Sequence, residues 1–277
     1  MTDQTVRSPE YGAADLYTRI RPLLGRWAER VRIDDADGYG PLGDPAPGPA
    51  LTGEHLLDRD WLADRVQDTV ARWDCPDLRT AGTLWWYSAS VTVVIAWPAA
   101  ALTGGDGPDM APQHLRGHLT EYGYLRSLRS DRAVPAADSA RSHRELCGAI
   151  IAGLAAVSGA SERALWAIAS DSLAGRMVDA VSSGVDRGAA HTLTEQIFTA
   201  PLIAPRFFDL TADDEGLAAA VPSMVGAPLP AGGRRVVRRG SCCLIYQVPG
   251  EGSKCRNCPR RTPAEKTDGW TRMLADG

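Results

Sequence analysis

Hydrophobic residues recur at helical spacing along the first two thirds of the chain. The clearest early case runs from about His55 to Asp74, where one face carries Leu62, Val66, Val70 and Trp73. Apolar residues three and four positions apart fall on the same side of an α-helix. This segment is therefore predicted to be an amphipathic helix that packs one face against a core.

Two more helices are predicted between residues 138 and 181. Asp138 is the expected N-cap of the first, which ends at Gly159, and the second begins at Ser161. Thr192 and Glu195 have the spacing of a capping box and predict the start of a shorter helix. Most of the chain before residue 200 is thus expected to be helical.

The regions outside these helices follow other patterns. Residues 115–134 are typical of a β-hairpin with its turn at residues 121–123. Residues 80–105 carry no charge and are long enough to cross a membrane. Polar residues and Pro98 interrupt them, however, and no second such segment follows, so we expect a buried core element. A loop at 211–233 is expected to lead into an extended basic run at 234–247.

Composition and charge narrow the class of protein. The chain has 277 residues, of which 44% are hydrophobic and 23% charged, as in globular proteins with a core of their own. The net charge of −4 argues against a nucleic-acid partner. Residues 234–261, in contrast, carry a net charge of +7. We therefore predict two units, a mainly helical body at 1–233 and a basic C-terminal module at 234–277.

Four of the six cysteines lie in this basic module, in the pattern C-C-x11-C-x2-C: Cys242, Cys243, Cys255 and Cys258. A C-x2-C spacing lets both thiolates reach one metal centre, and the adjacent pair completes a set of four. Such a set suits tetrahedral zinc or an iron–sulfur cluster.

The adjacent pair of cysteines helps to choose between the two metals. Neighbouring residues of a strand point to opposite faces, so Cys242 and Cys243 must lie in a turn or bulge to share a centre. A [2Fe–2S] cluster is longer than a single ion and has four outward positions. The spacing therefore favours iron–sulfur, with structural zinc as the alternative.

The flanks of the cysteines resemble a known family. The run Arg-Arg-Gly-Ser-Cys-Cys-Leu-Ile-Tyr at 238–246, followed by Pro249-Gly250 and the second pair, is similar to the C-terminal signature of the FhuF-like ferric siderophore reductases. The similarity covers about residues 238–261, and the gap between the pairs is one residue longer than in the founding form. The resemblance implies a [2Fe–2S] cofactor ligated by Cys242, Cys243, Cys255 and Cys258.

The resemblance also implies a function. A protein of this kind transfers one electron to a ferric siderophore, here expected to be of the hydroxamate type, and so releases Fe(II). No catalytic residue beyond the cluster is expected. Basic residues beside the cysteines are predicted to bind the anionic substrate: Arg238, Arg239, Lys254, Arg256 and Arg260. The tryptophans Trp85, Trp86 and Trp166 could line a siderophore cleft, but simple packing explains them as well.

Partners and compartment follow from motifs that the chain lacks. It contains no P-loop, dinucleotide fingerprint or nucleophile elbow, so electrons must come from reduced ferredoxin or a similar carrier. No secretory pattern opens the sequence, which predicts the cytoplasm, without an integral membrane span but compatible with peripheral membrane contact. The alternatives are a zinc module that binds an anionic partner, and a plain electron-transfer protein. The predicted fold class is α+β, mainly helical, with a small antiparallel β element and a cysteine-rich iron–sulfur module.

Overall fold

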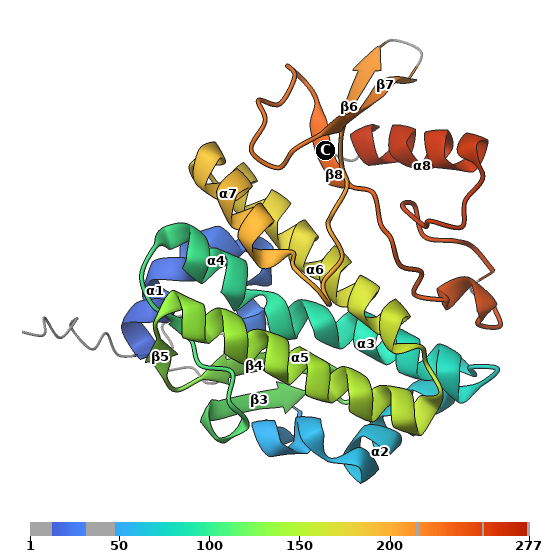
Figure 1. Cartoon of the computed structure of the whole chain (residues 1–277). Helices are drawn as coiled ribbons and strands as arrows, with labels where there is room; N and C mark the ends of the chain where they lie inside the picture. Colours follow the sequence, from blue (N-terminus) through green and yellow to red (C-terminus); the bar gives the residue numbers. More distant parts are fainter. Residues whose placement is uncertain (1–12, 32–47, 214–215, 251, 276–277) are drawn as a thin grey trace, which may run out of the picture.

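A computed structural model describes residues 13–31, 48–213, 216–250 and 252–275. The protein is a mainly helical α+β structure with small antiparallel sheets, as predicted (Figure 1). The α-helices are α1 (Ala13–Leu24), α2 (Arg59–Trp73), α3 (Leu78–Val94), α4 (Ala96–Thr103), α5 (Ala136–Ser158), α6 (Glu162–Ser182), α7 (Arg187–Ile197) and α8 (Pro263–Ala275). The strands are β1 (Ala50–Thr52), β2 (Gly107–Pro108), β3 (Leu115–Leu119), β4 (Leu125–Ser130), β5 (Ala133–Val134), β6 (Phe207–Asp213), β7 (Gly216–Ser223) and β8 (Arg234–Val237). Short 3₁₀ helices are η1 (Gly25–Val31), η3 (Gly53–Leu57), η4 (Pro112–His114) and η5 (Ile245–Gln247).

Helix α3 lies at the centre of the body, with α2, α5 and α6 packed around it (Figure 1). Its residues Trp85 and Trp86 are fully buried, so they belong to the core and not to a cleft. Each indole N–H is satisfied by a carbonyl, Gly123 O at 3.1 Å for Trp85 and Leu165 O at 2.8 Å for Trp86. Trp166 is only partly buried and packs against the same core.

The uncharged segment is this central helix together with α4. Leu78–Thr103 is the one stretch in the described residues that is long and apolar enough to cross a membrane. In the fold, 67% of its most apolar window is buried by the rest of the protein. Burial in the core therefore accounts for its lack of charge, as the sequence predicted.

The predicted hairpin is confirmed. Strands β3 and β4 pair antiparallel from Leu115 opposite Ser130 to Leu119 opposite Leu125, and β1 adds to the edge of β3. The leucines of these two strands are buried and join the core around α3. The sheet thus closes the side of the body that the helices leave open.

Two predicted helix starts are wrong. Helix α5 begins at Ala136, so Asp138 lies in its first turn and is not the N-cap. Thr192 and Glu195 lie inside α7, whose N-cap is Asp186 with Oδ1 accepting from Ala189 N at 2.7 Å. In α7 a better acceptor nearer the preceding turn takes the capping role, whereas the N-cap position of α5 is Pro135, which makes no side-chain cap.

The predicted loop at 211–233 is also wrong, because β7 occupies its middle. Strands β7, β6 and β8 form a three-stranded antiparallel sheet, in which Phe207 pairs with Val237. Helix α8 covers this sheet, and the Phe208 and Trp270 rings stack with centroids 5.7 Å apart. The boundary expected before residue 234 lies between strands β7 and β8 of this sheet.

Candidate metal centre

The four cysteines of the motif come together where the C-terminal module meets the body. Cys242 Sγ lies 3.7 Å from Cys258 Sγ. The thiols of Cys243 and Cys255 form a second hydrogen-bonded pair. Each contact joins one cysteine of the adjacent pair to one cysteine of the C-x2-C pair. The four thiols therefore form two pairs.

The two adjacent cysteines lie outside any strand, as their spacing predicted. Residues 241–244 are not in a strand, and Leu244 has a φ of +65° before η5 begins. A left-handed backbone is uncommon for a residue other than glycine. In this backbone, Cys242 faces Cys258 and Cys243 faces Cys255.

Hydrogen bonds to the backbone shape the C-x2-C loop. Cys258 N donates to Cys255 O at 3.0 Å, and Arg261 Nε donates to the same carbonyl at 2.8 Å. The side-chain amide of Asn257 donates to Val237 O and so ties the loop to β8. The loop that presents two thiols is thereby joined to the sheet.

Helix α8 holds the other side of this loop. A Cβ on Gly269 would lie 2.4 Å from Arg256 O, so only glycine lets the helix pack directly on the loop backbone. At its start, Thr262 N donates to Glu265 Oε2 at 2.7 Å and Glu265 N donates to Thr262 Oγ1 at 3.3 Å, which is a reciprocal capping box. The helix is thus a rigid backing for the cysteines.

The thiols differ in their ionisation. The hydrogen bond with Cys255 lowers the pKa of Cys243 to about 6 against the effect of burial, and the Arg239 charge assists. Burial raises the pKa of Cys242 to about 11. Metal ligands must be thiolates, so the site already favours the ligating form at Cys243 near neutral pH.

The remaining two cysteines lie apart from this group. Cys75 is buried beyond the end of α2, where its thiol lies 3.7 Å from Thr69 O. Cys147 is buried in α5, and burial raises the pKa of its thiol to about 12. Neither is placed to ligate the same centre, in agreement with their lack of a spacing pattern.

The five predicted basic residues differ in their surroundings. Arg239 is only 11% exposed at its side chain, and its Nη1 lies 3.4 Å from Cys255 Sγ. Lys254 pairs with Glu265 at 3.3 Å, and the Arg238 guanidinium lies over the Phe208 ring. Arg256 and Arg260 are exposed beside the ligand loop. The structure therefore places one of the five against a thiol, two against other side chains and two at the surface.

Two residues of the body that the sequence did not single out also reach this site. Asp171 in α6 accepts hydrogen bonds from the backbone N–H groups of Gly240 and Ser241, both at 2.9 Å. Tyr87 in α3 lies under Arg239, with the guanidinium 4.6 Å from the ring centroid. The only signal in the sequence for Asp171 is an acid in mid-helix between Ser170 and Ser172, and Tyr87 has none.

The donor set fits an iron–sulfur cluster better than a single ion. In the described part of the chain, no group of three or more histidine, cysteine or acidic side chains converges to hold one metal ion. Tetrahedral zinc would need all four thiolates around one point. The two thiol pairs, Cys242 with Cys258 and Cys243 with Cys255, would supply the four ligands of a [2Fe–2S] cluster.

Comparison with known proteins agrees with this geometry. Residues 239–260 match the family model of the FhuF 2Fe-2S C-terminal domain. This segment is similar to an FhuF-type 2Fe–2S domain. The cofactor of this module is accordingly a [2Fe–2S] cluster, and the chain is an iron–sulfur redox protein. The match covers the cysteine segment and not the helical body, and no curated protein matches the chain.

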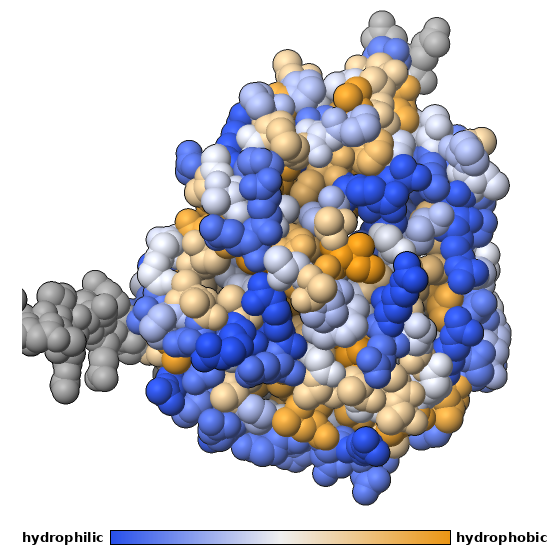
Figure 2. All heavy atoms as spheres, viewed as in Figure 1, coloured by the Kyte–Doolittle hydropathy of each residue, from blue (hydrophilic) through white to orange (hydrophobic). Residues whose placement is uncertain are grey.

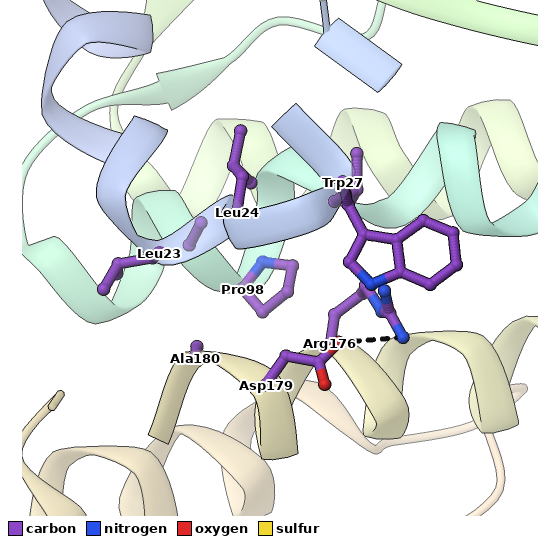
Figure 3. Close-up of a pocket in the computed structure, with 9 residues that line it drawn as sticks. Leu23, Leu24, Trp27, Pro98, Arg176, Asp179 and Ala180 are labelled. Carbon is purple, nitrogen blue, oxygen red and sulfur yellow. Dashed lines mark ion pairs between the residues drawn. The ribbon is translucent and has the colours of Figure 1, made fainter. Parts of the chain in front are cut away.

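A pocket in the body lies away from the cysteines, between α1, η1, α4 and α6 (Figure 3). Its polar side is the ion pair between Arg176 and Asp179, at 2.9 Å, and the Arg176 guanidinium lies over the Trp27 ring. Leu23 and Pro98 lie on its apolar side. None of its lining residues belongs to the FhuF-type segment, so this pocket is separate from the cysteine site.

The surface near the cysteines is polar. Figure 2 shows hydrophilic residues along one edge of the molecule. This edge is where α8 and the cysteine-bearing segment lie. Arg256 and Arg260 are exposed in that segment. The outer side of the site thus offers charge and not an apolar cleft.

Proposed function

We propose that this protein is a ferric siderophore reductase whose [2Fe–2S] cluster is held by Cys242, Cys243, Cys255 and Cys258. The observation that carries the proposal is the arrangement of these four thiols in two pairs inside the segment that matches the FhuF domain. We further propose that Cys242 and Cys258 ligate one iron, and Cys243 and Cys255 the other.

The distance between the thiols supports this pairing. Two thiolates bound at about 2.3 Å to one tetrahedral metal lie about 3.8 Å apart. Cys242 and Cys258 are 3.7 Å apart, and Cys243 and Cys255 are within hydrogen-bonding contact. Adjacent cysteines on the same iron would instead need their side chains to converge, whereas Cys242 and Cys243 contact different partners.

The chemistry needs little from the protein beyond placement. When bound, the cluster supplies one-electron transfer. A siderophore, here proposed to be a hydroxamate, holds Fe(III) through hard oxygen donors, and one electron from a reduced carrier protein yields Fe(II), which those donors hold far less tightly. Arg256, in the Cys255–Cys258 loop, and Arg260, just after it, are exposed and attract an acidic electron donor. No side chain is required to move a proton.

The test is a spectroscopic titration of anaerobically purified protein. We expect about two irons and two sulfides per chain and visible absorption bands that bleach with dithionite. After removal of the dithionite, a ferric hydroxamate complex should restore the bands, with one Fe(II) trapped by a chelator for each chain reoxidised. Bands that bleach but are not restored by any ferric siderophore would leave plain electron transfer.

Cysteine variants make the test specific. Cys243→Ser should lose most of its iron, whereas Cys147→Ser, which removes a buried thiol in α5, should keep about two irons. A colourless wild-type protein with one zinc and no sulfide would overturn the proposal in favour of a structural zinc module.

The pairing of ligands has its own measurement. In a reduced [2Fe–2S] centre, the cysteines on the ferric and ferrous irons differ in the temperature dependence of their β-proton NMR shifts. Selectively labelled cysteines should therefore sort into two groups, Cys242 with Cys258 and Cys243 with Cys255. Any other grouping contradicts the proposed pairing without affecting the assignment of the four ligands.

A further inference from the structure

Arg239 occupies the space between the cysteine site and the body. Its Nη1 lies 3.4 Å from Cys255 Sγ, and its Nη2 lies 3.4 Å from Ser241 Oγ. The guanidinium rests over the ring of Tyr87, which is 39% exposed, while the Arg239 side chain is only 11% exposed. A cation is thus held out of water against a thiol, by contacts with both the module and α3.

Asp171 fixes this arrangement from α6. Its carboxylate accepts from the N–H groups of Gly240 and Ser241 and from the Ser241 hydroxyl, the three donors directly before Cys242. Its Oδ2 also lies 3.6 Å from Arg239 Nε. Hydrogen bonds to an ionised carboxylate are stronger than neutral ones. One acid of the body therefore holds both the turn before the ligands and the cation beside them.

The consequence concerns the potential of the cluster. Reduction adds one electron to a group that four thiolates already make negative, so a buried cation and an N–H donor to sulfur favour the reduced state. We propose that Arg239 raises the reduction potential of the cluster through its contact with Cys255, and that Asp171 is the positioning residue that holds Arg239 there. This inference rests on the proposed ligation by Cys255 and not on the identity of the substrate.

Arg239→Met tests whether Arg239 raises the reduction potential, and Arg238→Met is the matched control. Both variants remove one positive charge, but the Arg238 guanidinium lies over Phe208, 5.6 Å from its ring centroid. The potential, measured by a redox titration of the visible bands, should fall clearly in Arg239→Met and much less in Arg238→Met. Equal shifts in the two variants, or no shift in Arg239→Met, would overturn the role of Arg239.

A milder variant covers the case in which Arg239→Met assembles no cluster. Arg239→Lys keeps the charge but cannot reach both Cys255 and Ser241 with one planar group. Its potential should lie below that of the wild type, and a value equal to the wild type contradicts the proposed contact. Iron content is measured on every sample, so a failure of ligation is distinguished from a failure of this inference.

Asp171→Asn tests the second half through the sign of its effect. Removing a negative charge near the cluster raises the potential by itself, because reduction adds negative charge. Releasing Arg239 from its position lowers the potential. We expect a net fall in Asp171→Asn and no comparable change in Asp179→Asn, a control two turns further along α6. A rise in Asp171→Asn would show that Asp171 acts through its own charge, and would overturn its positioning role.

The double variant Arg239→Met with Asp171→Asn separates the charge of Asp171 from its effect on Arg239. With Arg239 replaced by Met, Asp171→Asn has no guanidinium to release, so the same change should now raise the potential. A fall of the same size in both backgrounds would show that Asp171 does not act through Arg239.

Discussion

The helical body and the C-terminal module are ordered by different forces. In the body, Trp85, Trp86 and the apolar side chains of α5 and α6 form one large core. Between residues 238 and 262, the buried apolar side chains include Leu244 and Val248, and Val248 belongs to that same core. The segment is held instead by side chains bonded to backbone groups, Asp171, Asn257 and Arg261 among them.

This difference matters for the function. Apolar burial stabilises a structure but is non-directional, whereas hydrogen bonds place individual atoms. A ligand site needs its thiols within a few tenths of an ångström, and a small module without a core of its own gains stability from the metal it binds. The body therefore supplies a stable support, on which α3 and α6 present Tyr87 and Asp171 to the cysteines.

The largest effect on stability is expected from truncation in the body. Trp86→Ala removes a fully buried indole and leaves Leu165 O without its partner, so the free energy of unfolding should fall by about 3–5 kcal/mol. Chemical denaturation followed by circular dichroism measures this loss. Trp166→Ala, at a partly buried position, should cost clearly less, and equal losses would contradict the assignment of Trp86 to the centre of the core.

A comparable but local loss of stability is expected when the β6–β7–β8 sheet loses its buried ion pair. Arg235 binds Asp209 through both carboxylate oxygens, at 2.7 and 2.8 Å, and both side chains are less than 10% exposed. Burial by itself raises the pKa of Asp209, but its bonds with Arg235 and Ser223 outweigh this and lower it. Arg235→Met leaves a buried charge unpaired and should cost about 3–5 kcal/mol in this sheet.

Hydrogen exchange locates that loss. Protection should fall in β6 and β8 and remain unchanged in α3. The double variant Arg235→Met with Asp209→Asn removes the unpaired charge and should recover part of the protection. A loss spread evenly over the body would show that the two regions unfold together.

Acid is expected to weaken the body through one histidine. Burial lowers the pKa of His143 to about 4, where it stacks on Trp97 and its Nδ1 lies 2.8 Å from Ser139 O. Since this value lies below that of the unfolded chain, near 6.5, the unfolded state binds the proton first as the pH falls. The neutral His143 imidazole therefore contributes fully to the free energy of unfolding above pH 6.5. This contribution, about 3 kcal/mol in total, is lost as the pH falls toward 4.

The variant His143→Gln should lose this part of the pH dependence, measured as unfolding free energy between pH 7 and pH 4. His191→Gln, at a histidine whose side chain is 41% exposed in α7, is the control and should follow the wild type. Identical slopes for His143→Gln and the wild type would contradict the burial of a neutral imidazole.

The smallest effect is expected at the start of α8. Thr262→Ala removes one half of the capping box and should weaken the helix by about 1 kcal/mol. The loss should be seen as faster hydrogen exchange in the first turn of α8, with iron content unchanged. Thr267→Ala, inside the same helix, should have a smaller effect because its hydroxyl donates only to Pro263 O.

Local patterns in the sequence were enough to predict several helices, the hairpin and the metal centre of this protein. Helical periodicity predicted α2, α5 and α6, and alternation with a turn predicted the β3–β4 hairpin, because these patterns reflect which face is buried. The spacing of four cysteines in a basic segment predicted the metal centre, since few arrangements explain so many thiols so close together. Resemblance of the flanks then identified the cluster type that the family match supports.

Other features were decided only by the tertiary structure. Strand β7 is formed because β6 offers it a partner, while its own residues, such as Ala218 to Ala220, carry little strand signal. The contact of Cys242 with Cys258 depends on a loop that packs against α8. Asp171 and Tyr87 reach the site from helices far away in the sequence. Local patterns record whether a side chain is buried, but which side chains meet is set by how the elements pack.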